Sequence, residues 1–168
     1  MKTLALLRNL TIRCLELTLI GLVAILVLDV SWQVITRYLL GRPSTWTDEL
    51  ATLLMIWVAS LGAGLGFRQK AHLGIDYMVT HLSPKGQFWT EIATQLVVFV
   101  FAVSILVYGG IHLVSLTLAT NQVSPALGMR MGWVYLALPV SGLFIAWSAL
   151  DQAAERWSEA RNERTRAK

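Results

Sequence analysis

The sequence predicts an all-α integral membrane protein with four transmembrane helices. Of its 168 residues, 55% are hydrophobic and only 14% are charged, whereas soluble chains carry about 25% charged residues. The apolar residues gather in long stretches, and about 20 mainly apolar residues suffice for a helix to cross the ~30 Å hydrocarbon core of a bilayer. We expect a single membrane domain over residues 1–168, with spans at about 15–37, 45–67, 89–118 and 132–151.

The first span is expected to stay in the protein. Its apolar region is longer than the 7–15 residues of a signal-peptide core, and no small-residue cleavage site follows it. Cys14 is the only cysteine, which excludes an internal disulfide and a multi-cysteine metal site. The pI near 9.6 could indicate nucleic-acid binding, but the basic residues flank the predicted spans, where they act as orientation signals. No nucleic-acid partner is therefore expected.

The distribution of basic residues predicts the topology. Three precede the first span, three lie between the second and third, and five follow the fourth, whereas the opposite side has only Arg37, Arg42 and Arg130. Because cytoplasmic loops are enriched in Lys and Arg, both termini and the loop between the second and third spans should be cytoplasmic. The charged tail over 152–168 is then a cytoplasmic continuation of the last helix.

The loop between the second and third spans is predicted to hold a short amphipathic helix over about 72–83. Its apolar residues follow the spacing of one helical face, namely Ile75, Met78, Val79 and Leu82. The segment is too short to span a bilayer, so we expect it to lie on the cytoplasmic interface, in contact with phospholipid headgroups. His72 and Asp76 are four residues apart and are expected to pair with each other and anchor the helix.

No catalytic residue, metal site or cofactor is predicted. His72 and Asp76 could share a metal ion, but no third ligand follows at helical spacing. His112 lies in the third span without a second histidine in any span, whereas a haem held by two histidines needs both. Nucleophile-elbow, P-loop and HExxH patterns are absent from the sequence. The chain is therefore not expected to be an enzyme.

A polar stripe near the outer end of the first span is formed by Asp29, Gln33 and Arg37, each four residues from the next. Polar residues inside spans are expensive and usually face protein or a cavity. One interpretation is an ion or substrate path. The favoured one is that the stripe meets another helix or subunit, with Arg37 pairing to Asp29, Asp48 or Glu49.

The second span has a marked beginning and a small-residue face. Thr45 and Asp48 have the spacing of a capping pair, and Glu49 adds negative charge beside the positive helix end. Gly62 and Gly66, four residues apart, predict close packing against another membrane helix. Together with the polar stripe, we assign five of these residues to helix pairing or a partner interface, in addition to Asp29 and Gln33: Arg37, Asp48, Glu49, Gly62 and Gly66.

The fourth span is predicted to bend. Pro139 removes one backbone hydrogen bond inside it, so we expect a kink near Tyr135–Pro139.

Residues 37–78, "RYLLGRPSTWTDELATLLMIWVASLGAGLGFRQKAHLGIDYM", resemble the small membrane subunit (DctQ-like) of tripartite ATP-independent periplasmic (TRAP) transporters. The later stretch "SPALGMRMGWVYLALPVSG" resembles the family's segment leading into the last span, except that Met131 stands near where a proline is expected. The likeness covers nearly the whole chain, and the matching positions are Arg37, Trp46, Asp48, Glu49, Trp57, Leu61, Gly62, Ala63, Arg68, His72, Asp76, Ser124, Leu127, Trp133, Tyr135 and Pro139.

The resemblance implies a scaffold role in the bacterial inner membrane. Such subunits associate with a much larger membrane subunit that carries substrate and sodium, and a soluble periplasmic binding protein delivers the substrate. The complex takes up organic anions with an ion gradient, without ATP. By this resemblance the chain braces the large carrier and helps to dock the binding protein, for which Arg42 and Arg130 are candidate contacts.

Two alternatives belong to other classes. The first is a self-contained four-helix transporter, acting as a homodimer with Asp29 as its coupling carboxylate. A single off-centre carboxylate and the absence of an internal repeat weigh against it. The second is a membrane haem protein, which an absorption spectrum would exclude.

Overall fold

The structure is a computed structural model that describes residues 2–42, 44–69 and 84–166. These residues form helices joined by short loops: α1 (Lys2–Tyr38), α2 (Thr45–Arg68), α4 (Pro84–Phe101), the π-helix η1 (Ala102–Gly109), α5 (Gly110–Ala119), α6 (Met131–Tyr135) and α7 (Ala137–Arg166).

Within the described residues, four helical segments are long and apolar enough to cross a membrane, in agreement with the predicted all-helical class and four spans. They are Arg8–Tyr38, Thr45–Arg68, Gly86–Ala119 and Met131–Ser158. The predicted interfacial helix, with His72, Ile75, Asp76, Met78, Val79 and Leu82, lies outside the described residues.

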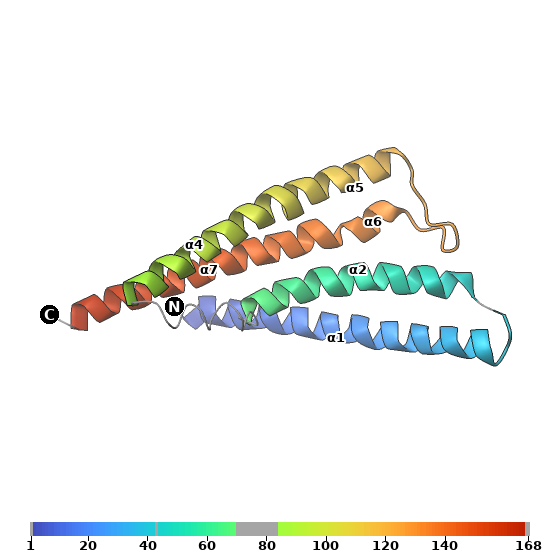
Figure 1. The fold of residues 1–168 in the computed structure, drawn as a ribbon, viewed down its shortest axis with the longest axis horizontal. Coiled ribbons are helices and arrows are strands. Elements are labelled where there is room, and N and C mark those ends of the chain that lie inside the picture. Colours follow the sequence, from blue (N-terminus) through green and yellow to red (C-terminus); the bar gives the residue numbers. More distant parts are fainter. Residues whose placement is uncertain (1, 43, 70–83, 167–168) are drawn as a thin grey trace.

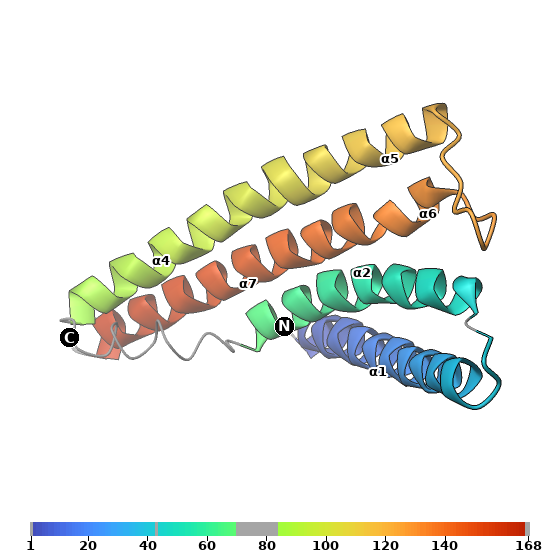
Figure 2. The same cartoon turned by 45° about the vertical axis from the view of Figure 1, so that its right-hand side comes forward.

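The helices stand side by side in a row (Figures 1 and 2). Among the described helices, α1 packs beside α2, α2 beside α7, and α7 beside the continuous α4–η1–α5 segment. In the central window of the span that contains α7, 50% of the residues are buried, against 6% in α1. The two edges of the row, α1 and α4–η1–α5, therefore expose most of their apolar surface. Both chain ends lie at one end of the row, and the loops over 39–44 and 120–130 lie at the other (Figure 1).

The core lies between α7 and the third span. Its buried members, joined by the partly buried Val98, Phe99 and Leu106, are Phe67, Ala102, Ile145, Ala146 and Ala149. Glycines allow this close approach: a Cβ at Gly142 would lie 2.6 Å from Leu106 Cβ, and a Cβ at Gly110 would lie 2.8 Å from Pro139 Cδ. Any side chain at these two positions would push the helices apart.

The predicted small-residue pair of α2 does not make the closest contact of that helix. A Cβ at Gly62 would only touch Leu19, at 4.0 Å, and a Cβ at Gly66 would meet nothing within 4 Å. Gly64 is the close-packed position, because a Cβ there would lie 3.0 Å from Phe144 Cδ1 on α7. The glycine spacing indicated a packing face, but the contact with α7 lies on a different side of α2.

The predicted kink in the fourth span is confirmed. α6 ends at Tyr135 and α7 begins at Ala137, so the helix is interrupted at Leu136, three residues before Pro139. Because proline has no N–H to donate, the break lies within one turn of Pro139. The opposite stretch of the third span is the eight-residue π-helix η1, and Leu106 and Val107 of η1 pack against Gly142.

The predicted capping pair at the start of α2 is wrong. The N-cap residue is Ser44, which makes no side-chain capping bond, and Thr47 Oγ1 donates to the Ser44 carbonyl at 2.8 Å. Asp48 instead accepts a hydrogen bond from Gln33 on α1, and Glu49 reaches toward the loop over 120–130. The carboxylates thus connect α2 to other parts of the chain.

Candidate functional site

The loop over 120–130, at the end of the row opposite the chain termini (Figure 1), is a compact hairpin. Ser124 N donates to the Met129 carbonyl at 2.9 Å, and Met131 N donates to the Gln122 carbonyl at 2.9 Å. Gly128 lies in the left-handed region, with φ +64°, where a residue without Cβ has no steric cost. These bonds give the loop a defined shape rather than leaving it an open connection.

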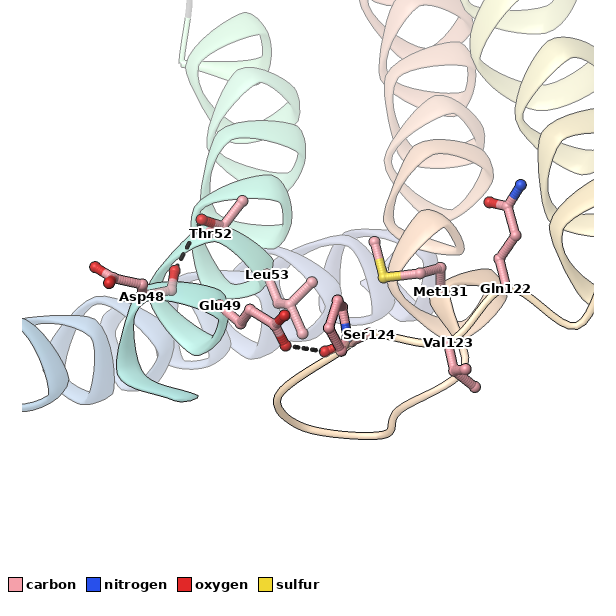
Figure 3. Close-up of a pocket in the computed structure, with 9 residues that line it drawn as sticks. Asp48, Glu49, Thr52, Leu53, Gln122, Val123, Ser124 and Met131 are labelled. Atoms are coloured by element: carbon pink, nitrogen blue, oxygen red, sulfur yellow. Dashed lines mark hydrogen bonds between the residues drawn. The ribbon is translucent and has the colours of Figure 1, made fainter. Parts of the chain in front are cut away.

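Glu49 ties this hairpin to α2 (Figure 3). Its carboxylate accepts hydrogen bonds from Ala126 N at 3.0 Å and Leu127 N at 3.1 Å, and from the hydroxyl of Ser124. Hydrogen bonds to a charged group are stronger than neutral ones, and Ser124 is buried. One side chain on α2 therefore fixes the loop that joins the third and fourth spans.

An open pocket of about 520 Å³ lies between the start of α2 and this hairpin. Leu53, Val123, Pro125 and Met131 supply its apolar wall, and its polar lining consists of Asp48, Glu49, Thr52, Gln122 and Ser124. In Figure 3 the side chain of Glu49 points to Ser124, whereas that of Asp48 points away from it. An apolar wall beside carboxylates suits a protein side chain or peptide segment better than a reaction centre.

The polar stripe of α1 meets α2 within the chain. Asp29 and Thr36 are buried, and Gln33 Nε2 donates to Asp48 Oδ1. This agrees with the favoured interpretation, in which the stripe meets another helix. Figures 1 and 2 show α1 and α2 side by side over their length.

The predicted ion pair of Arg37 with Asp29, Asp48 or Glu49 is wrong within the described part of the chain. Arg37 is exposed and forms no ion pair there. Its neighbour Thr36 is buried instead. The carboxylate of Glu49 is bonded to the loop over 120–130. Arg42 and Arg130 are also exposed, so three exposed arginines lie at the end of the row opposite the chain termini.

The other end of the row is held by an ion-pair cluster that sequence reasoning missed. Arg68 Nη1 on α2 lies 2.7 Å from Asp151 Oδ2 on α7, and Arg8 on α1 pairs with Asp151 at 3.8 Å and with Glu155. Arg156 pairs with Glu91 of α4. The cluster links all four spans. The available signal was the four-residue spacing of Asp151 and Glu155, which puts both carboxylates on one helix face.

The comparison with protein families decides the identity. Residues 26–159 match the family described as "Tripartite ATP-independent periplasmic transporters, DctQ component". The chain belongs to the DctQ family. This confirms the resemblance seen in the sequence, and the matched range runs from the outer half of α1 into the charged part of α7.

Characterised relatives of this DctQ-family chain agree. It is 29% identical over 140 residues to the sialic acid TRAP transporter small permease protein SiaQ of Vibrio cholerae, covering 82% of this chain and 78% of that one. It is 31% identical over 114 residues to the C4-dicarboxylate TRAP transporter small permease protein DctQ of Rhodobacter capsulatus, covering 67% and 49%. It is 28% identical over 113 residues to the sialic acid TRAP transporter permease protein SiaT of Haemophilus influenzae, covering 67% of this chain but only 18% of that longer protein.

Proposed function

We propose that this DctQ-family protein is the scaffold subunit of a secondary organic-anion uptake transporter in the bacterial inner membrane. It braces a large membrane carrier subunit and helps to dock a periplasmic substrate-binding protein. The observation that carries the proposal is the open row of spans in a chain of the DctQ family: both edges of the row expose apolar surface that the chain does not cover itself.

A large partner in the membrane is supported by the relative SiaT. The match to this chain occupies 18% of that permease protein, so in SiaT a similar segment is joined to a much longer chain. For the separate chain we infer that the equivalent contact is made between subunits. Gly66, where no atom would meet an added Cβ, and the exposed Arg37 are candidate contacts with the large subunit.

The docking role is supported by the structure of the two loops at the end of the row opposite the chain termini. Glu49 holds the hairpin over 120–130 in one shape, and Arg130 and Arg42 stand exposed beside it and the preceding loop. Pre-shaped loops with exposed charge suit a transient protein contact, because rim charges speed encounter and set orientation. This assignment requires the outer end to face the periplasm and both termini the cytoplasm, as the distribution of basic residues predicts.

The same proposal includes the energy source of transport. We infer sodium-coupled symport driven by an ion gradient, with the substrate and ion sites in the large subunit. Phospholipid headgroups would hold the segment over 72–83 at the cytoplasmic interface. The self-contained homodimeric transporter is not favoured, because Asp29, its would-be coupling carboxylate, is buried in the described structure, on the same stripe as Gln33, which bonds to Asp48 of α2.

The proposal is tested by reconstitution. Proteoliposomes with an inward sodium gradient should take up an organic anion only when this chain, the large subunit and the binding protein are all present. Sialic acid and C4-dicarboxylates are the first substrates to try, since relatives carry those names. Uptake by this chain alone would contradict the scaffold role, and uptake of equal rate without this chain would show that the complex does not need it.

A further inference from the structure

The exposed face of the third span carries polar side chains at successive turns. Ser104, Tyr108, His112 and Ser115 are all exposed, and Tyr108 is 76% exposed. The opposite face of the same span carries Ala102, Gly110 and Thr117, which are buried toward α6 and α7. The polar residues therefore point away from the rest of the row.

Two of these side chains lack a hydrogen-bond partner among the described residues. The serine hydroxyls are satisfied locally, because Ser104 donates to the Val100 carbonyl at 2.6 Å and Ser115 to the His112 carbonyl at 2.7 Å. No such bond is formed by the Tyr108 hydroxyl or the His112 ring within the described chain. Hydrocarbon offers no acceptor, so polar groups at membrane depth normally find a protein partner.

The depth of both residues follows from the packing of the third span on α7. Gly110 lies against Pro139, and Pro139 is six residues inside the apolar stretch that starts at Trp133. At 1.5 Å per residue this puts Gly110 about 9 Å inside, so that His112 lies about 6 Å and Tyr108 about 12 Å inside. Both lie inside the Gly86–Ala119 segment, which is long and apolar enough to cross a membrane.

The π-helix supports a special role for this face. η1 runs over eight residues, Ala102–Gly109, and contains both Ser104 and Tyr108. π-helical turns are rare and frequently occur at functional sites. Here η1 packs one side on α7 while the other side presents Tyr108.

The opposite edge of the row, formed by α1, exposes mainly apolar side chains over its middle part. Leu17, Ile20 and Leu28 of α1 are 68%, 64% and 71% exposed. Two exposed hydroxyls within this stretch of α1 bond to their own helix: Thr18 donates to the Cys14 carbonyl at 2.8 Å and Ser31 to the Val27 carbonyl at 2.7 Å. This edge is suited to lipid without further hydrogen bonds.

We infer that the Tyr108–His112 face of α4–η1–α5 contacts the large carrier subunit, and that the apolar face of α1 at Leu17, Ile20 and Leu28 faces lipid. The occupant is a transmembrane helix of that subunit, which offers hydrogen-bond acceptors to the Tyr108 hydroxyl and the His112 ring. This inference rests on the proposed function, because it names the surface through which the scaffold holds its partner. Side-chain hydrogen bonds between membrane helices are a recurrent means of association.

Site-specific photo-crosslinking in membranes tests the inference. The chain and the large subunit are co-expressed with p-benzoylphenylalanine in place of Tyr108 or, as the matched control, Leu28. Irradiation should join the chain to the large subunit from position 108 and not from position 28. A protein adduct from position 28 alone, an adduct between two copies of this chain, or lipid adducts alone at position 108 would overturn the inference.

A substitution series at His112 gives a second readout. His112→Leu should lower the amount of large subunit recovered with the chain about threefold to tenfold, while the amount of chain in the membrane stays constant. His112→Gln, which keeps a hydrogen-bonding group, should restore most of it. Unchanged recovery with His112→Leu would contradict the inference while the complex itself still forms. Failure of the unmodified chain to recover any large subunit would instead reject the proposed function.

Discussion

The carboxylate of Glu49 accepts a hydrogen bond from the hydroxyl of Ser124, 75 residues further along the chain. The same carboxylate accepts the backbone N–H groups of Ala126 and Leu127. These bonds hold the start of the second span and the loop between the last two spans together in one surface. A single residue of α2 thus controls the shape of a loop that belongs to neither end of its own helix.

Replacing Glu49 should release this loop. With Glu49→Ala, the amide hydrogens of Ala126 and Leu127 should exchange with deuterium much faster, because both amides lose the carboxylate that accepts their hydrogen bonds. Asp48→Asn is the matched control, since Asp48 neighbours Glu49 but bonds to Gln33 instead. Unchanged exchange at both amides in the Glu49→Ala protein would show that the hairpin holds its own shape.

Gly142 should not tolerate a methyl group. A Cβ there would lie 2.6 Å from Leu106 Cβ and 3.1 Å from Val107 N, so Gly142→Ala must separate α7 from η1 and should cost about 1–3 kcal/mol. Thermal unfolding in detergent measures the loss. Gly66→Ala, in open space within the described chain, should leave the melting temperature of the isolated chain unchanged, and equal losses for the two variants would contradict the packing described.

Cysteine labelling should place the loops over 39–44 and 120–130 in the periplasm. In a Cys14→Ser background, cysteines at the exposed positions Leu40 and Val123 should react with a membrane-impermeant maleimide in intact cells, and one at the exposed Ser158 should react only after lysis. Ser124 is unsuitable, because it is buried against Glu49. The reverse pattern would overturn the orientation and move the proposed docking surface to the cytoplasm.

Arg130 should act in docking and not in assembly. Arg130→Glu is expected to reduce uptake and binding-protein affinity, because the substitution reverses the charge at an exposed position of the hairpin. The amount of complex with the large subunit should stay the same. Arg37→Ala, by contrast, should lower the amount of complex, because Arg37 is a proposed contact with the large subunit. Neither variant should change which substrate is chosen, and an altered substrate preference would show that this chain lines the transport path.

The number of spans and their order along the chain could be predicted from the sequence, whereas most of the tertiary contacts could not. Span number and the kink beside Pro139 follow from local rules of hydropathy and backbone chemistry. The partners of Glu49 and Arg68 depend on how the spans are arranged in space, and one sequence does not contain that information. Thr45 and Asp48 are an example: their spacing fits a capping pair, but Asp48 accepts a hydrogen bond from Gln33 on the neighbouring helix instead.

The glycines illustrate the same limit. Gly62 and Gly66 have the spacing of a packing motif, yet Gly64 is the one that meets α7 at close range. A small-residue pattern indicates which helix can approach another, but the direction of approach is set by the partner.

Native mass spectrometry of the complex purified from membranes through a tag on this chain is the most direct test. One copy of this chain should be found with one copy of the large carrier subunit, and the isolated chain should be less stable and less monodisperse than the complex. A tagged chain that is recovered as a stable homodimer, with no large subunit attached, would contradict the scaffold role.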